Sequence, residues 1–484
     1  MKTQQKRFLA ALLSIATLGT GALCDARVVG IGGTPNVEPP ATCGAPQTRS
    51  FALMAMAGSI TLGDGNSLLA WGYAADPGAM QYPGPVLIVC EGDTVQVTLQ
   101  NRLPDPVSIV FPGQENVLAS GGSQGPLALT NEVAAYDAGA ATQPSVTYTF
   151  TATHAGTYQY HSGSESELQV EMGLVGALIV RPAGYVQGTY ATHDTNRRAY
   201  ATSATGYDVE YLFFLTEMDR AAHEAMEDAL LDPTIARPNP ADFKETLWFI
   251  NGRNGPDTMI EQNAPWLPHQ PYNALAQMHP GDRVLMRLVG AGRDLHPFHH
   301  HGNNAWMIAR DGRVLESTAN TSVPYPDYVG IPAGDLTGRA NALPDQSISN
   351  FTIQTVPGST YDALFTWTGK SLNWDVYGDR DGHKPGAGCG ARLAFEDPQS
   401  HCKPFPVTLP EQQALSFGGL WGGSQYLGTV EALPPLQGGL NPAGGFSFMW
   451  HSHTERELTN DDIFPGGMMT MLIVQAANSE AVIE

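Results

Sequence analysis

Apolar and polar residues follow β-strand patterns along two long parts of the chain. In the first part, Val86–Val89 is a continuous apolar run, and Thr94–Leu99 alternates apolar and polar residues after a Gly-Asp turn. Thr147–His161 continues the pattern with a break at Gly156, and Leu174–Val180 has the composition of a buried strand. Helical signals are absent here, so residues 50 to 182 are predicted to form a Greek-key β-sandwich.

The second part runs from the apolar strand at Tyr207–Leu215 to that at Met468–Val474. Within it, a Gly-Asp turn precedes the strand Val284–Val289, as in the first part, which indicates weak internal repeats. Arg220–Leu231 is the one predicted amphipathic helix, with His223 expected on its solvent face. The sequence therefore predicts an all-β fold with domains over residues 27–183 and 206–478, a linker over 184–205, and a long loop-rich insertion over about 370–438.

Composition supports sandwiches and limits the partners. Charged residues make up 15% of the 484, while the chain has 53 glycines and 36 prolines, so turns are many and charges few. The 25 basic and 47 acidic residues give a net charge of −22. Such a charge repels nucleic acid and anionic lipid, and we expect neither as a partner.

The N-terminus has the pattern of an export signal. Lys2, Lys6 and Arg7 precede the apolar run Phe8–Leu18 and then small residues, which predicts a signal peptide over residues 1–26 and a periplasmic or extracellular protein. Leu23 before Cys24 disfavours lipidation. No later apolar run is long enough to span a bilayer, so no integral membrane segment is expected.

Four cysteines remain after the predicted signal peptide. An even number in an oxidising compartment favours disulfides. Proximity along the chain favours Cys43–Cys90 and Cys389–Cys402, although the sequence alone leaves three pairings open.

Seven of the 14 histidines fall in three short β-segments. Residues i and i+2 of a strand face the same way, so His299 and His301 share one face, as do His451 and His453. On neighbouring strands these two pairs would bring four imidazoles together, which favours a transition-metal site, with copper ahead of zinc. The alternative is that the histidines only pack or form hydrogen bonds. His300 should point to the opposite face of its strand.

These segments also carry a family resemblance. The chain resembles the multicopper oxidases, which are built from cupredoxin domains, and the similarity covers most of residues 50–182 and 245–475. The strings that carry it are Pro83-Gly84-Pro85, Glu91-Gly92-Asp93-Thr94, Gly156-Thr157-Tyr158-Gln159-Tyr160-His161-Ser162, Gly173-Leu174-Val175-Gly176, His296-Pro297-Phe298-His299-His300-His301-Gly302, His451-Ser452-His453 and Gly467-Met468-Met469. The resemblance implies two cupredoxin-type sandwiches and copper as the cofactor.

The motifs depart from the family pattern at several positions. Val110-Phe111-Pro112-Gly113 replaces the first His-x-His-Gly motif, and Gly163 replaces the second histidine of the next motif. By resemblance, His296 matches a type 1 ligand, His299 a type 2 ligand and His301 a type 3 ligand. His451 and His453 match type 3 ligands, Met468 fills the axial type 1 position, Ser452 replaces the type 1 cysteine, and Glu457 replaces the second type 1 histidine.

These losses predict a reduced copper site. A blue copper centre needs a thiolate, which Ser452 cannot supply. The ligands expected to remain are His161, His299, His301, His451 and His453, enough for a mononuclear or dinuclear site. His296 and Met468 are weaker candidates, which together with Glu457 are better interpreted as ordinary pocket residues.

The predicted function is that of an exported copper-dependent oxidoreductase without a blue centre. Its partner would be a small-molecule or metal-ion substrate or an electron-donor protein. A copper-binding or sequestering protein without turnover and a structural cupredoxin scaffold are the alternatives. Because two-domain relatives place their site between chains, we expect a homotrimer, with a monomer covered by the insertion as the alternative.

Overall fold

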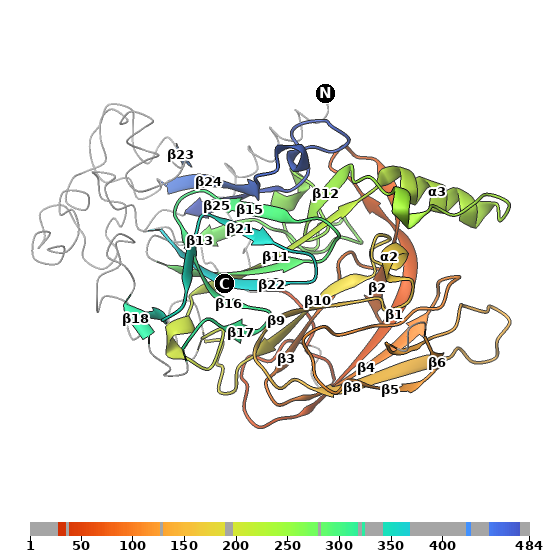
Figure 1. Ribbon diagram of the computed structural model, residues 1–484, viewed down its shortest axis with the longest axis horizontal. Helices are drawn as coiled ribbons and strands as arrows, with labels where there is room; N and C mark the ends of the chain where they lie inside the picture. The colour runs from red at the N-terminus through yellow and green to blue at the C-terminus, as the bar shows by residue number, and fades with distance from the viewer. Residues whose placement is uncertain are drawn as a thin grey trace, which may run out of the picture.

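The described residues of this computed structural model form two β-sandwiches (Figure 1). The structure describes residues 28–34, 38–125, 129–188, 197–278, 282–317, 322–324, 342–367, 423–426 and 445–474. The predicted signal peptide, nearly all of the predicted insertion and the cysteines Cys389 and Cys402 lie outside the described residues. Among the described residues, no helix combines the length and the apolar character needed to cross a bilayer.

The first sandwich comprises residues 48–181 and packs a five-stranded sheet, in the order β2-β1-β4-β8-β5, against a three-stranded sheet, β3-β10-β9. The predicted segment Thr147–His161 divides into β8 and β9, which lie in different sheets, so the break at Gly156 is where the chain crosses the sandwich. A short helix, α2, was not predicted. The elements are β1 (Thr48–Thr61), β2 (Ser67–Ala75), β3 (Gly84–Cys90), β4 (Thr94–Asn101), β5 (Leu118–Gly121), β6 (Ser123–Gln124), β7 (Asn131–Glu132), β8 (Ser145–Thr151), β9 (Gly156–His161), α2 (Ser166–Gln169) and β10 (Val175–Arg181).

The second sandwich comprises residues 209–474 and pairs a seven-stranded sheet built around β11, β14 and β22 with a six-stranded sheet built around β25, β24 and β15. Its elements are β11 (Val209–Met218), α3 (Arg220–Leu231), η4 (Pro240–Asp242), β12 (Leu247–Ile250), η5 (Asp257–Met259), β13 (Ala276–Met278), β14 (Arg283–Gly290), β15 (His296–His300), β16 (Ala305–Arg310), β17 (Arg313–Val314), β18 (Ser322–Pro324), β19 (Ala342–Pro344), β20 (Ile348–Asn350), β21 (Thr352–Thr355), β22 (Thr360–Thr366), β23 (Gly423–Tyr426), β24 (Gly445–Ser452), η9 (Glu455–Leu458) and β25 (Met469–Val474). Among the described residues between the two sandwiches, Ser203–Thr205 form a 3₁₀ turn, η3.

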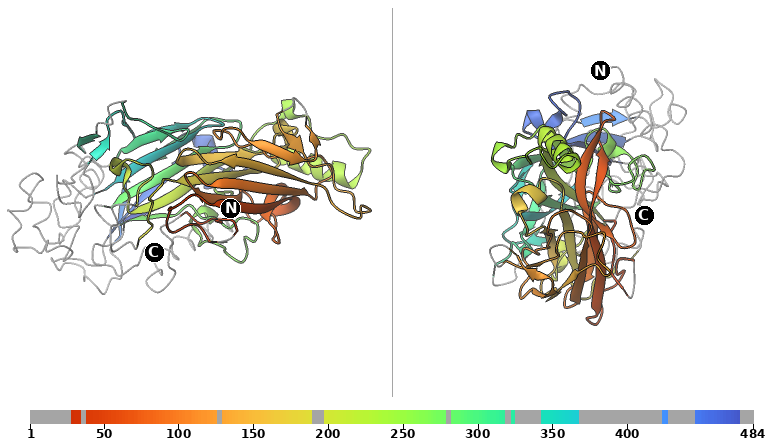
Figure 2. Two further views of the ribbon diagram at one scale, coloured as in Figure 1. Left: turned by 90° about the horizontal axis from the view of Figure 1, so that it is seen from below. Right: turned by 90° about the vertical axis from the view of Figure 1, so that its right-hand side faces the viewer.

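The two sandwiches share an apolar interface. One cluster of buried side chains includes Ile88 and Ile179 of the first sandwich together with Phe214 and Val289 of the second. Figure 2 shows strands of the two halves lying side by side, and β9 contacts both β14 and β22. Burial of apolar surface is the main favourable term in such packing, so the interface fixes the two sandwiches against each other.

A buried row of charges crosses the same interface. Arg181 of β10 pairs with Glu210 of β11 at 2.9 Å, and Glu210 pairs with Arg287 of β14 at 2.9 Å. Arg287 also approaches Asp362 of β22 at 3.7 Å, and all four side chains are at most 2% exposed. We call these four residues the charge seam. Because its charges alternate in sign, each buried ion has a counter-ion.

Helix α3 has the predicted bounds, but the prediction for His223 is wrong. Asp219 accepts hydrogen bonds from the amides of Ala221 and Ala222 and so caps the helix. His223 is fully buried instead of facing solvent. Its Nδ1 lies in hydrogen-bond contact with the Leu69 carbonyl and its Nε2 with the Glu171 carbonyl, so α3 packs against the first sandwich along β2. The 3.6-residue periodicity of the sequence did not show that the face of α3 carrying His223 is also buried.

The predicted disulfide Cys43–Cys90 is confirmed, with the two Cα atoms 5.4 Å apart. It ties the segment before β1 to the end of β3. A disulfide of this kind is typical of an oxidising compartment, which agrees with the export expected from the N-terminal sequence.

Candidate metal centre

Two paired strands bring four histidines together. β15 and β24 are antiparallel, and His299 lies directly opposite His451 in their register. The ring centroid of His299 is 4.8 Å from that of His301, 5.5 Å from that of His451 and 4.9 Å from that of His453. The prediction that the two His-x-His pairs meet is therefore confirmed, and we call these four residues the histidine cluster.

The ring nitrogens converge in a way that suits a metal ion. One ligand atom each from His299, His301 and His451 lie within 4.8 Å of one another, and Nε2 of His451 is 3.2 Å from Nε2 of His301. Two imidazole nitrogens that ligate one ion at about 2.0–2.1 Å, the distance found for zinc, lie roughly 3 Å apart in neighbouring coordination positions. The His301–His451 pair already has that spacing.

The other ring nitrogens are held by neighbouring oxygens. Nδ1 of His451 lies 2.6 Å from the carbonyl oxygen of Ser452, and Nδ1 of His299 lies 2.8 Å from Oγ1 of Thr352 on β21. An Nδ1–H that donates to oxygen leaves Nε2 with its lone pair, which is the tautomer that binds a metal. Thr352 was not singled out from the sequence, because its contact depends on the pairing of β15 with β21.

Burial keeps these imidazoles neutral. Desolvation, reinforced by the other cluster histidines, lowers the pKa of His299 to about 4. Desolvation also lowers the pKa of His451 to about 4, with His301 and His453 acting in the same direction. His299 and His451 thus offer neutral nitrogens, and imidazole donors of this kind fit a borderline metal such as copper or zinc.

These shifts predict that acid destabilises the metal-free protein. The unfolded chain takes up protons at His299 and His451 near pH 6.5, whereas the folded chain does so only near pH 4. Folding stability should therefore fall as the pH drops from 6.5 to 4. The drop should be shallower in a His299→Asn/His451→Asn double variant, as measured by urea unfolding at several pH values. Equal slopes in the two proteins would contradict the assignment.

His300 and His453 differ in their surroundings, one in the core and the other exposed to solvent. His300 points to the opposite face of β15, as predicted, and packs among Phe365 and Trp450 in the core. His453 is exposed, so the histidine cluster is open to solvent on that side. Beside it, the ring of Phe351 lies 5.8 Å from that of His299 and is 44% exposed.

His161 does not join the cluster within this structure. It ends β9 in the first sandwich, where its Nδ1 lies 2.9 Å from the Ser162 carbonyl and its backbone pairs with Val110. The segment Val110-Phe111-Pro112-Gly113, which replaces the first His-x-His-Gly motif, thus lies next to His161. At Gly163 a Cβ atom would lie 2.7 Å from Val110 Cγ1, so the backbone there has no room for the family's histidine without a shift.

The positions of the type 1 motif also converge, but they do not fit a blue copper ion. Ser452 donates its amide to the Met468 carbonyl at 3.0 Å, and Met468 donates its own to the Glu457 carbonyl at 2.7 Å. His296 is fully buried with both ring nitrogens in contact with carboxylates. A thiolate is missing and the imidazole is already engaged on both sides.

Comparison with known proteins supports the family. Residues 78–184 match the sequence model described as multicopper oxidase. A probable nitrite reductase-hydroxylamine oxidoreductase fusion protein of Kuenenia stuttgartiensis is 25% identical over 281 residues, covering 56% of this chain and 26% of that protein. Laccase-1 of Thanatephorus cucumeris is 27% identical over 295 residues, covering 59% of this chain and 44% of that protein.

Among solved structures, the blue copper oxidase from Nitrosomonas europaea is 18% identical, with 88% of this chain and 85% of that chain covered and a TM-score of 0.48. The all-β fold itself is defined by the strand topology described above. The chain spans less than half the length of the two curated relatives named here. The sequence matches show that this chain is similar to multicopper oxidases over part of its length, and its strand topology is all-β with two sandwiches.

Proposed function

We propose that this protein binds copper at the histidine cluster and is an oxidoreductase with a reduced, mononuclear or dinuclear site. The observation that carries the proposal is the convergence of ring nitrogens from His299, His301 and His451 at the paired strands β15 and β24. Bound copper would supply one-electron redox chemistry and Lewis acidity. His299 and His451 would hold it through nitrogens whose orientation is fixed by the oxygens of Thr352 and Ser452.

The substrate is proposed to reach the site directly. Without a type 1 centre, electrons have no relay through Ser452, so the substrate or electron donor would have to meet the copper at the histidine cluster itself. The named relatives include a laccase and a probable nitrite reductase fusion, so phenols, metal ions and nitrite are the substrates to test. An electron-donor protein is the other source of electrons.

Loss of the thiolate also favours a second candidate function, copper binding without turnover. Metal analysis with electron paramagnetic resonance of copper-loaded protein tests the site itself, and turnover assays then separate the two functions. Copper bound without turnover of any tested substrate favours sequestration. If the protein bound no copper, both proposed functions would be wrong, and a structural cupredoxin scaffold would be the remaining alternative.

Copper-loaded protein is expected to lack an intense blue charge-transfer band, because Ser452 cannot form the copper–thiolate bond. Ser452→Cys alone should not restore the band, since Glu457 is in contact with the His296 Nδ1 and stands where a second imidazole is needed. Absorption spectra of both proteins check this. A blue band with Ser452 in place would show the ligand assignment to be wrong.

We further propose export and a homotrimer with one copper site at each interface. His161 in the first sandwich and the cluster in the second would then meet between neighbouring chains. The exposed side chain of Phe351, whose ring lies 5.8 Å from that of His299 and is 44% exposed, supports a covered face there. The disulfide Cys43–Cys90 supports a periplasmic or extracellular location.

Light scattering should give three times the chain mass, and Phe351→Ser should lower the trimer fraction while Leu231→Ser, an exposed change on α3, should not. A monomer that still binds one copper through His161 would defeat the trimer. The N-terminal sequence of protein recovered from the culture medium or periplasm tests export, and an intact residue 1–26 segment would contradict it.

A further inference from the structure

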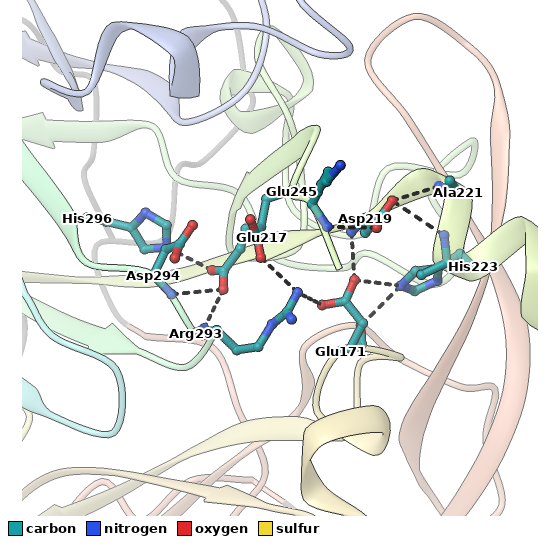
Figure 3. A network of polar contacts seen from close by, with 11 residues as sticks. Glu171, Glu217, Asp219, Ala221, His223, Glu245, Arg293, Asp294 and His296 are labelled. Atoms are coloured by element: carbon teal, nitrogen blue, oxygen red, sulfur yellow. Dashed lines mark hydrogen bonds and ion pairs between the residues drawn. The ribbon is translucent and has the colours of Figure 1, made fainter. Parts of the chain in front are cut away.

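A buried histidine lies between two carboxylates at the position that matches a type 1 ligand. His296 begins β15 and is fully buried. Its Nδ1 lies 2.9 Å from Oε2 of Glu457 on η9, and its Nε2 lies 2.8 Å from Oε2 of Glu217 on β11. Figure 3 shows the imidazole of His296 beside the carboxylate of Glu217.

The hydrogen bonds of His296 determine how many protons its imidazole ring holds. An ionised carboxylate only accepts hydrogen bonds, so a ring nitrogen in contact with one has to donate. Since both nitrogens of His296 face a carboxylate, the ring that satisfies both contacts is the imidazolium, with a proton on each nitrogen. A ring in that state has no lone pair for a metal.

We propose that Glu217, His296 and Glu457 form a metal-free charge triad, in which the doubly protonated His296 is the counter-ion that replaces copper in this pocket. The inference concerns a different site from the histidine cluster and does not depend on copper binding there.

The electrostatics of the pocket agree with the geometry. Burial alone would lower the pKa of His296, but the hydrogen bonds and charges of Glu217 and Glu457 outweigh it and raise the pKa to about 9. Asp294 adds a further negative charge nearby. Two carboxylates buried without a positive charge nearby would be destabilising. The compensating charge can be a metal ion or the extra proton of an imidazolium ring, and His296 can hold that proton.

Glu217 is held in place from the other side. Its Oε1 accepts the backbone amides of Arg293 and Asp294, and the Arg293 guanidinium pairs with Glu171 and Glu245 at 2.8 Å each. Figure 3 shows this network passing from His296 through Glu217 and Arg293 to Glu171. Since Glu171 precedes β10 of the first sandwich, the triad is part of a larger polar contact between the two halves.

The triad therefore links separate chain segments through charge contacts, as a structural metal ion would through its ligands. It ties the start of β15 to β11 and to η9, three segments that are distant in sequence. His296 of the triad lies three residues before His299 of the histidine cluster, and both residues belong to β15. His296 is a positioning residue in this interpretation and not a ligand.

Nuclear magnetic resonance of ¹⁵N-histidine-labelled, metal-free full chain at pH 7.5 tests the protonation directly. One histidine should show two protonated ring nitrogens, and that signal should be missing in His296→Gln. In Glu457→Gln the pH at which this ring loses a proton should fall by about one unit or more. Glu455→Gln, an exposed change on the same η9, should leave it unchanged. A neutral His296 ring at pH 7.5 would overturn the proposal.

Titration with Cu²⁺ gives the second test. His296→Gln and Glu457→Gln should bind the same number of copper ions as the unmodified protein, with Kd changed by less than about twofold. Loss of one copper equivalent in either variant would overturn the metal-free triad. If the unmodified protein bound no copper, the proposed function would fail while the resonance result would still decide the triad. Should His296→Gln not fold, Glu457→Gln supports both measurements.

Discussion

Copper affinity is expected to fall more than about 100-fold when His301 is replaced by alanine. His301 supplies the nitrogen 3.2 Å from Nε2 of His451, so its loss removes half of the closest pair in the cluster. Replacing residues that only orient ligands already costs 10–100-fold, and a direct ligand should cost more. His453→Ala should also weaken binding, since its ring lies 4.9 Å from that of His299. Competition with a chromophoric chelator measures both constants.

The matched control is His154→Ala, an exposed histidine of the first sandwich outside the cluster. It should leave the copper Kd unchanged. His223 is unsuitable as a control, because it is buried and its replacement would disturb the packing of α3. Equal copper affinity in the His301, His453 and His154 variants would refute the cluster as the binding site.

The charge seam predicts the largest effect on stability. Arg287→Met should lower the free energy of unfolding by about 3–5 kcal/mol, the range found when one partner of a buried ion pair is removed. Arg287 lies 2.9 Å from Glu210, donates to Thr157 at 3.0 Å and approaches Asp362. Methionine would fill the space while leaving Asp362 without its nearest cation. Urea unfolding monitored by tryptophan fluorescence measures the loss.

Arg310→Met is the control for this experiment. Arg310 and Asp311 form an ion pair at 3.4 Å, but the two side chains are 50% and 51% exposed. Exposed pairs contribute about 0–1 kcal/mol because water and salt screen them. A comparable loss of stability in the two variants would show that the seam does not join the two sandwiches through its buried charges.

The strands and the cluster followed from short-range patterns. Alternation and apolar runs predicted the cores of β3, β4 and β10, and the two-residue period of a strand predicted that His299 and His301 would face the same way. Those inferences needed only local geometry. The pairing of β15 with β24 was the one long-range step, and the symmetry of the two His-x-His strings supported it.

Other features depend on contacts that no local pattern contains. The burial of His223 arises because β2, more than 140 residues earlier in the chain, lies beneath α3. The partner of His296 on β11, Glu217, lies beyond the predicted end of that strand at Leu215. A charged residue continuing a buried apolar strand was the available signal, because such a residue needs a partner. The identity of that partner could come only from the fold.

The way α3 covers β2 also bears on how copies of this chain could associate. β2 is an outer strand of its sheet, and outer strands can add a strand from another molecule. Here the Leu69 carbonyl is taken by His223, and the amide of Trp71 donates to the Met172 carbonyl at 2.7 Å. These two outward backbone groups are already occupied. Contact between copies along β2 would therefore have to use side chains and not backbone pairing, which protects this edge against uncontrolled edge-to-edge aggregation.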